Sequence, residues 1–232
     1  AGRNPRSPEA EVVLERLLNQ GARGLAIRCD VADRDQVQAL IATAQEAAPL
    51  QGVIHATGAL ADAGLAGQTW ETFEQVLAAK VLGSWHLHEL TADLELEHFV
   101  LFSSAAGLLG PAGQTNHAAA NSFIDALAHA RRAFGLPALA IDWGAWAEVG
   151  AAVRDDLEAR VERTGLIHMA PESALAALAW AMSQNAAQIA ILDADWATYR
   201  RRYPLGGVPP LTPKPSSTIG AGSHTTLTPS PS

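Results

Sequence analysis

Short apolar runs alternate with longer amphipathic stretches over most of the chain, and this alternation restricts the fold more than any other feature. Runs with the length of buried strands occupy residues 25–29, 52–56, 98–102, 138–143 and 188–192. The stretches between them space their apolar residues at the helical period. Strands that alternate with helices form βαβ units, so we expect an α/β fold whose doubly wound parallel sheet is covered by helices on both faces.

Capping residues and glycines mark the helix boundaries. Ser7 can cap a first helix that Pro8 opens and Gly21 ends. Asp33 can cap a second helix that reaches Ile41. Further helices are predicted over residues 69–91, 113–134, 155–163 and 171–183.

One domain followed by a tail is the expected organisation. A chain of 232 residues, 48% of them hydrophobic, can bury one substantial core. The residues after Pro204 are mainly Pro, Ser, Thr and Gly and offer little apolar surface to bury. We therefore expect a domain over residues 1–204 and a linker or tail over residues 205–232.

Composition excludes several classes of protein. The net charge of −8 argues against nucleic acid as a partner, because proteins that bind it gather Lys and Arg on one face. No apolar run approaches the roughly 20 residues of a membrane-spanning helix, and the N-terminus lacks the apolar segment of a signal peptide. The single cysteine, Cys29, cannot form an internal disulfide. We expect a soluble, cytoplasmic protein without a membrane partner.

Polar and small residues follow the predicted strands, where ligands of open α/β sheets bind. They are Asp30, Thr57, Gly58, Ser104, Trp143 and Gly144. Lys80 lies on a predicted helix, and His117 and Asn121 lie one turn apart on one helix face. The other histidines show no metal-ligand spacing with Cys or carboxylates, and we expect them to be structural or to lie on the surface; they include His55, His86, His88, His129 and His168.

The residues around Ser104 and His117 resemble the active-site segment of a known family. The run 102–110 (Phe-Ser-Ser-Ala-Ala-Gly-Leu-Leu-Gly) and the run 113–121 (Gly-Gln-Thr-Asn-His-Ala-Ala-Ala-Asn) are similar to that segment in ketoreductase (KR) domains of modular type I polyketide synthases. Further matches follow in order at residues 80–83, 142–146 and 195–196. The resemblance covers about residues 1–204 and implies a Rossmann-type fold of the short-chain dehydrogenase/reductase superfamily.

That family begins with a strand and a glycine-rich loop whose backbone N–H groups hold the pyrophosphate of a dinucleotide. The sequence starts beyond the place where this segment would stand. We therefore expect an N-terminally truncated domain, with a Rossmann-type sheet that lacks its first strand and glycine-rich loop. The chain alone should bind cofactor poorly.

The resemblance implies NADPH-dependent reduction of the β-keto group of an acyl chain on an acyl carrier protein. Neighbouring synthase domains would be further partners. In the family a serine, a tyrosine, a lysine and an asparagine act on the carbonyl, and Ser104, Lys80 and Asn121 match three of these. His117 stands at the tyrosine position, so the alternative is a catalytically silent scaffold domain. A free-standing dehydrogenase of a small alcohol is a third hypothesis, against which the tail argues.

Histidine can serve as the donor in principle. A neutral imidazole donates one N–H, and its reach is shorter than that of a phenol, so a water or a shifted substrate would be needed. Lys80 and an oxidised nicotinamide nearby would disfavour an additional cation. We therefore expect His117 to be neutral at rest.

The resemblance also implies a set of cofactor contacts: Arg3, Asp30, Val31, Ala56, Thr57, Gly58, Lys80, Trp143 and Gly144. Arg3 would pair with a 2′-phosphate, although it can equally be a frayed terminal charge. Trp143 and Trp146 can equally be core aromatics. Residues 60–62 and Asn116 partly match ketoreductases of the B stereochemical type.

Overall fold

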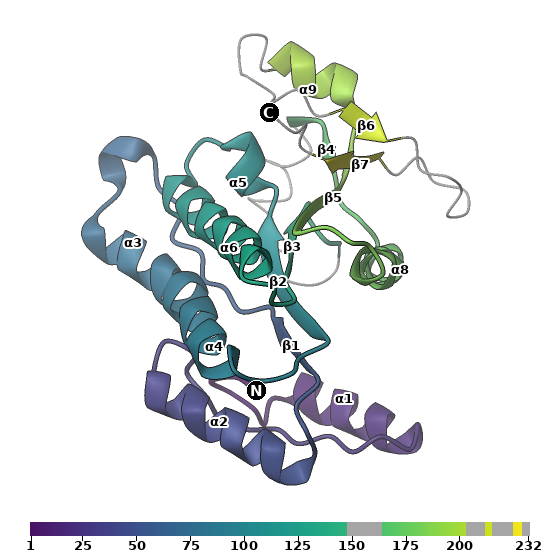
Figure 1. Cartoon of the computed structure of the whole chain (residues 1–232). Coiled ribbons are helices and arrows are strands. Elements are labelled where there is room, and N and C mark those ends of the chain that lie inside the picture. Colours follow the sequence, from purple (N-terminus) through teal and green to yellow (C-terminus); the bar gives the residue numbers. More distant parts are fainter. Residues whose placement is uncertain (148–163, 203–211, 215–224, 229–232) are drawn as a thin grey trace.

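The computed structural model describes residues 1–147, 164–202, 212–214 and 225–228. Its centre is a sheet of parallel strands in the order β1 (Gly52–His55), β2 (His98–Ser104), β3 (Leu139–Trp143) and β5 (Gln188–Ala194) (Figure 1). Antiparallel strands extend it beside β5: β4 (Leu166–Ile167), β7 (Thr225–Thr228) and, beyond β7, β6 (Thr212–Lys214). The expected α/β fold with a largely parallel sheet is confirmed.

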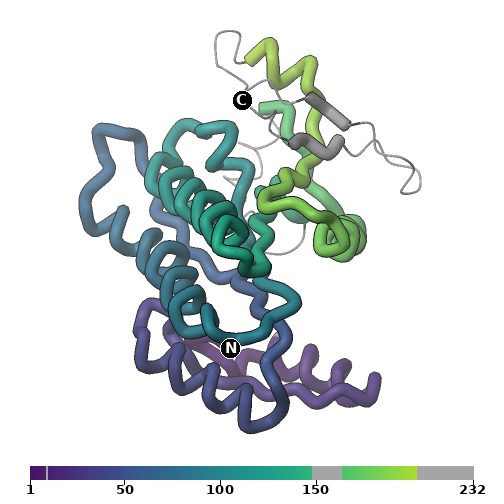
Figure 2. The backbone as a smooth tube through the Cα atoms, in the orientation of Figure 1, coloured from purple at the N-terminus to yellow at the C-terminus, as the bar shows by residue number. Residues whose placement is uncertain are grey.

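Helical segments, seen as coils of the tube in Figure 2, precede, connect and follow these parallel strands. They are α1 (Pro8–Asn19), α2 (Arg34–Ala47), the 3₁₀ turn η1 (Leu65–Gly67), α3 (Trp70–Leu77), the π turn η2 (Ala78–Leu82), α4 (Gly83–Thr91), α5 (Ala106–Leu109), α6 (Thr115–Ala133), α8 (Pro171–Met182) and α9 (Trp196–Arg202). The helix expected over residues 155–163 lies outside the described residues.

The predicted caps are confirmed. Ser7 accepts a hydrogen bond of 3.3 Å from the backbone of Ala10 at the start of α1. Gly21 ends this segment with a positive φ of 78°. Asp33 caps α2 by accepting hydrogen bonds from the backbone of its first turn. These boundaries are set locally, so the sequence specifies them.

The prediction of a strand over residues 25–29 is wrong. Only an isolated bridge joins Arg28 to Gly2, through hydrogen bonds from Gly2 N to Ile27 O and from Cys29 N to Gly2 O. The chain bends at Arg3 and enters a turn before α1, so no ladder can continue along this pair. The strands expected over residues 52–56, 98–102, 138–143 and 188–192 are present as β1, β2, β3 and β5.

Two core clusters lie on opposite faces of the sheet. On one face, Phe99 and Leu101 of β2 pack with buried residues of α2, α4 and α6. On the other face, Val100 of β2 and Ile141 of β3 pack with α8. Side chains alternate between the two faces along a strand, so Leu101 and every second residue of β2 counted from it point toward α6. Ser103 is the next such residue on β2, and Asp142 is its register partner on β3. Both are buried on the same face.

Two departures from the expected elements are informative. The helix expected over residues 69–91 is interrupted by the π turn η2, which carries Lys80. Strands β6 and β7 lie in the segment that we expected to be a linker or tail. The division of the chain at residue 204 stays a prediction.

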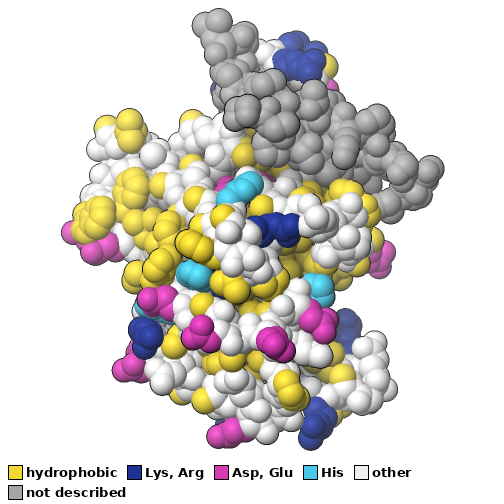
Figure 3. Space-filling model, in the orientation of Figure 1, with side chains coloured by type: hydrophobic (Ala, Val, Ile, Leu, Met, Phe, Trp, Pro, Cys, Tyr) yellow, Lys and Arg dark blue, Asp and Glu magenta, His cyan; other side chains and the backbone are white. Residues whose placement is uncertain are grey.

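Charged side chains do not form a continuous basic surface on the face shown in Figure 3, where acidic and apolar side chains separate most of the basic ones. In the part of the chain that the structure describes, no helix is both long enough and apolar enough to cross a membrane. Groups of three or more His, Cys, Asp or Glu side chains able to hold a metal ion do not occur among the same residues.

Candidate active site

Lys80 lies buried beside strand β2. Its side chain projects from η2, and the residue is only 5% exposed. The Nζ atom donates a hydrogen bond of 2.7 Å to the carbonyl oxygen of Phe102. Burial lowers the pKa of Lys80 to about 8, whereas the carboxyl groups of Asp125 and Asp142 act in the opposite direction. The ammonium group is therefore a proton donor suited to neutral or mildly alkaline pH.

The π turn that carries Lys80 is held by residues at the end of β1. Thr57 donates a hydrogen bond of 3.3 Å from Oγ1 to Ala79 O, and the same oxygen lies 3.4 Å from Nε2 of His55. A Cβ on Gly58 would lie 3.4 Å from Cε of Lys80, so the backbone approaches the lysine closely. A π turn adds a residue to one helical turn and is frequent at functional sites. Here it directs the lysine toward β2.

Ser104 is the last residue of β2, two positions after the carbonyl that Lys80 contacts. Its Oγ accepts a hydrogen bond of 3.2 Å from the backbone N of Ala106, at the start of α5. This bond uses a lone pair of the oxygen and leaves the hydroxyl hydrogen to be donated. The hydroxyl is thus fixed at the carboxyl end of the sheet.

His117 and Asn121 lie on α6, which packs against η2 and β2. Asn121 donates a hydrogen bond of 2.7 Å from Nδ2 to His117 O. Nδ1 of His117 and Oδ1 of Asn121 are buried and have no hydrogen-bond partner among the described residues. Burial lowers the pKa of His117 to about 4, and the charge of Lys80 acts in the same direction. His117 is therefore neutral at pH 7, as expected.

The start of α6 also holds the loop that follows β1. Asn116 is fully buried and donates hydrogen bonds of 2.8 Å to Ala61 O and 3.1 Å to Thr72 O. Gln114 donates a hydrogen bond of 2.9 Å to Oδ2 of Asp62. The loop at residues 61–62 and the start of α6 are therefore in contact beside His117.

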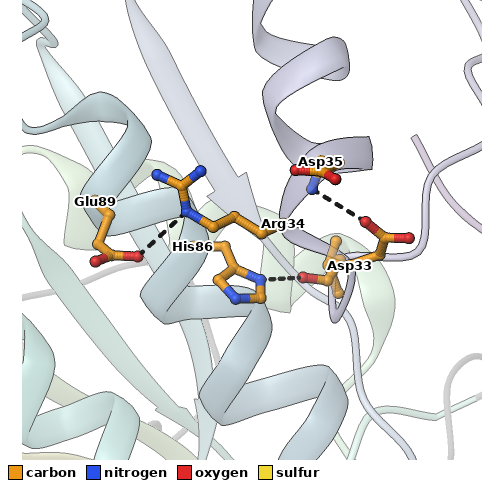
Figure 4. A network of polar contacts seen from close by, with 6 residues as sticks. Asp33, Arg34, Asp35, His86 and Glu89 are labelled. Carbon is orange, nitrogen blue, oxygen red and sulfur yellow. Dashed lines mark hydrogen bonds and ion pairs between the residues drawn. The ribbon is translucent and has the colours of Figure 1, made fainter.

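The loop that carries Asp30 and Val31 is anchored to α4 and α2. Nδ1 of His86, on α4, lies 3.1 Å from the carbonyl oxygen of Val31. The backbone N of Asp30 donates a hydrogen bond of 2.9 Å to the side chain of Gln36 on α2. An ion pair of 3.8 Å joins the same two helices through Arg34 and Glu89 (Figure 4).

The remaining cofactor candidates differ in their surroundings. Arg3 is exposed, and it directly follows the bridge between Gly2 and Arg28. Ala56 is exposed directly after β1. Thr57 and Gly58 contact the turn that carries Lys80, as described above.

Trp143 and Gly144 follow β3. The Trp143 ring is 6% exposed and packs in the core with Phe102 and Trp146, at centroid distances of 5.4 and 5.0 Å. This environment favours the core-aromatic alternative for the Trp143 ring. Gly144 donates a hydrogen bond of 2.8 Å to Ile191 O, and a Cβ on it would lie 2.8 Å from Cβ of Leu192. A glycine is therefore required there by packing.

The structure adds residues that the sequence reasoning did not select. Asp125 on α6 and Asp142 on β3 are 6% and 0% exposed, and both act on the pKa of Lys80. A signal for each was present in the sequence. Asp142 interrupts an apolar strand, and Asp125 lies one turn beyond Asn121 on the same helix face. Buried carboxyl groups are uncommon enough to mark a functional environment.

The unpaired groups fit one end of a nicotinamide dinucleotide. Lys80 has ammonium hydrogens beyond the one donated to Phe102 O, and Oδ1 of Asn121 is an acceptor without a donor among the described residues. Gly58 lets the backbone approach this region without a side chain. Together these groups can bind the hydroxyls of a ribose next to a reacting carbonyl.

Comparisons with known proteins agree with this geometry. Residues 1–148 match the family model of the KR domain. The chain belongs to the KR domain family. It is 40% identical to the polyketide synthase GfsA of Streptomyces halstedii over 209 residues, which are 90% of this chain and 3% of that protein.

Solved ketoreductases share the fold of this KR domain. One structure described as A-type ketoreductases from a modular polyketide synthase superposes with a TM-score of 0.84 at 40% identity, covering 87% of this chain and 43% of that one. A short-chain dehydrogenase from Burkholderia cenocepacia J2315, solved with NADP, has a TM-score of 0.67 at 19% identity, over 79% of this chain and 81% of that one. The second similarity concerns the Rossmann-type fold alone. The KR chain thus spans less than half of the ketoreductase structure and a small part of the synthase.

Proposed function

We propose that this KR domain reduces the β-keto group of an acyl chain held as a thioester on an acyl carrier protein, with NADPH as the reductant. The observation that carries the proposal is that the buried Lys80 lies against the strand that ends in Ser104 and that its charge acts on His117, whose carbonyl oxygen accepts a hydrogen bond from Asn121. Preorganised donors of this kind stabilise negative charge on a carbonyl oxygen. Membership of the KR family supports the same assignment.

Each residue has a distinct role in the proposed reaction. When bound, NADPH supplies the hydride for the carbonyl carbon. The Ser104 hydroxyl and an N–H of His117 donate hydrogen bonds to the carbonyl oxygen, where negative charge develops. Lys80 is the proton source, because its pKa of about 8 is close to the operating pH. Oδ1 of Asn121, an acceptor without a donor among the described residues, would accept a hydrogen bond from a ribose hydroxyl of the bound cofactor.

The remaining candidates form the proposed cofactor site. We assign Asp30 and Val31 to the adenine, because α2 and α4 hold their loop in place. We assign the segment 56–58, which follows β1, to the ribose and nicotinamide, and the Trp143–Gly144 backbone at the end of β3 to the same cofactor. Arg3 is assigned to the 2′-phosphate, which would select NADPH over NADH. Neighbouring synthase domains and the carrier protein are the proposed partners, consistent with relatives that are polyketide synthases.

The test is NADPH oxidation by the domain, expressed together with the flanking polypeptide of its parent gene. A β-ketoacyl N-acetylcysteamine thioester serves as substrate, and mass spectrometry identifies the product. We expect a β-hydroxyacyl thioester in amounts equal to the NADPH consumed. A folded protein that binds NADPH without turnover would overturn the proposal in favour of a silent scaffold domain.

A further inference from the structure

The carboxyl groups of Asp125 and Asp142 are buried in the core near Lys80, the proposed proton source. Ser103 of β2 and Asp142 of β3 are register partners in the parallel sheet, and both point toward α6. Asp125 of α6 is directed to the same place, since the side chains of Ser103 and Asp142 both act on its pKa. The Ser103 hydroxyl itself donates a hydrogen bond of 3.4 Å to Asn121 O. A Cβ on Gly107 would lie 3.2 Å from Oδ2 of Asp125, so α5 packs closely against this carboxyl group.

The two carboxyl groups lack enough donors to be ionised together. Asp142 accepts a hydrogen bond of 2.8 Å at Oδ2 from Nε2 of Gln188. The Oδ1 atoms of both Asp125 and Asp142 are buried and unpaired among the described residues. Two adjacent carboxylates without solvent repel each other strongly, so one of them retains its proton. A proton between them would also serve the unpaired oxygens.

The electrostatic surroundings agree with a single shared proton. Burial raises the pKa of Asp142 to about 8, and the charge of Asp125 adds to this. Burial likewise raises the pKa of Asp125, which Lys80 on η2 and His129 on α6 oppose. The pair titrates as a unit, and over the neutral range it holds a single negative charge.

That charge faces Lys80. The charged or titratable groups that act on the Lys80 site are the Asp125 and Asp142 carboxyl groups and the imidazoles of His55 and His117. Burial lowers the pKa of both histidines to about 4, so they are neutral at pH 7. The carboxyl pair is therefore the source of negative charge that offsets the buried ammonium.

We propose that Asp125 and Asp142 share one proton and that their single remaining negative charge is the counter-charge that keeps Lys80 protonated for catalysis. The two aspartates are positioning residues, because they act through Lys80. The part of this inference that concerns turnover rests on the proposed function, whereas the shared proton is a property of the folded protein.

Infrared spectroscopy of the folded domain tests the shared proton without any turnover. At pH 7 the wild type should show the C=O stretch of a protonated carboxyl group, and both Asp142→Asn and Asp125→Asn should lose it. Asp93→Asn, at an exposed position, is the matched control and should keep the band. A wild-type spectrum without a protonated carboxyl band would overturn the inference and leave the reductase proposal intact.

The pH dependence of kcat tests the counter-charge. A single Asn replacement removes a protonated group and leaves the other aspartate ionised, so the net charge facing Lys80 does not change. Each single variant should therefore keep the alkaline limb of the profile, where Lys80 loses its proton. The double variant Asp125→Asn/Asp142→Asn should move this limb to lower pH by about one unit, with KM for the thioester unchanged.

The outcomes separate this inference from the proposed function. Single variants that shift the limb as far as the double variant would show that the two groups do not share one charge. A double variant with an unshifted limb would show that the pair does not act on Lys80. Both results overturn the inference although the domain remains a reductase, whereas absence of turnover in the wild type overturns the function alone. Should the double variant fail to fold, the infrared comparison of the single variants still decides.

Discussion

Nζ of Lys80 lies 2.7 Å from the carbonyl oxygen of Phe102, and this hydrogen bond ties the helix of the lysine to the strand that ends in Ser104. The proposed proton source and the serine hydroxyl are therefore placed by the same strand. Because the peptide carbonyl cannot move independently of β2, the position of the lysine depends on the sheet and less on its own flexible side chain.

Replacement of Lys80 by Met should abolish most turnover. The methionine side chain has similar length and fills the buried space, but it cannot donate a proton, so we expect kcat/KM to fall by roughly 100-fold or more. Steady-state NADPH oxidation measures this, and circular dichroism checks the fold. The control is Arg23→Met, which removes an exposed positive charge and should leave the rate unchanged. Full activity of the Lys80 variant would exclude the lysine as the proton source.

Ser104→Ala should lower kcat by roughly 100-fold, because a hydrogen bond to the developing oxyanion is lost. KM for the thioester should change little. Ser122, exposed on α6, supplies the matched control, and Ser122→Ala should behave as the wild type. Equal kinetics for the two alanine variants would remove Ser104 from the site.

His117 distinguishes an active domain from a silent one. If the neutral imidazole already donates a hydrogen bond, His117→Phe should lower kcat by about 100-fold, and His117→Tyr should stay within about 10-fold of the wild type. Both variants keep a planar ring at the start of α6, so the comparison isolates the donor. A gain of more than about 100-fold on introducing tyrosine would instead indicate that the wild-type domain is catalytically silent.

Gly83→Ala should weaken cofactor binding by displacing Val31. A Cβ at this position would lie 2.7 Å from Cγ2 of Val31 and 3.1 Å from Cε1 of His55. Overpacking of this kind costs about 1–3 kcal/mol of stability. We expect a higher Kd for NADPH by fluorescence titration and a lower Tm. Gly64→Ala, where nothing lies within 4 Å of the added atom, should change neither quantity; equal effects at both positions would contradict the assignment of Val31.

Asp142→Asn should change how stability depends on pH. In the wild type the pKa of Asp142 rises from 3.8 to about 8 on folding, so between these values the folded state holds a proton that the unfolded state has lost. Its favourable contribution is complete below pH 3.8 and is lost as the pH rises toward 8. The Tm of the variant relative to the wild type should therefore increase from pH 4 to pH 8. A constant difference would show that Asp142 ionises normally.

Site residues that lie close together in the sequence could be predicted, whereas contacts between residues distant in the sequence could not. The motif around Ser104, His117 and Asn121 is contiguous in sequence, and the structure brings Lys80 to the same region as His117 and Asn121. The helix caps at Ser7 and Asp33 are likewise local and were predicted.

Features that depend on partners distant in the sequence were missed. Residues 25–29 have the composition of a strand, but a strand forms only where another backbone pairs along its length. Within the described parts of the chain, Gly2 alone pairs with this run, through one bridge to Arg28. The meeting of Asp125 with Asp142 depends on how α6 lies over the β2–β3 register. The π turn at Lys80 depends on contacts with Thr57, 22 to 23 residues earlier, rather than on helix propensity.

Isotope transfer from the cofactor tests the central claim most directly. The domain is incubated with NADPH that carries deuterium at the transferable position of C4, together with a β-ketoacyl thioester, and the product is examined by mass spectrometry. We predict a β-hydroxyacyl thioester with a single deuterium on the β-carbon, formed roughly 100-fold more slowly, or slower still, by the Lys80→Met variant. Recovery of unreduced thioester from a folded domain with NADPH bound would contradict the assignment of this protein as a ketoreductase.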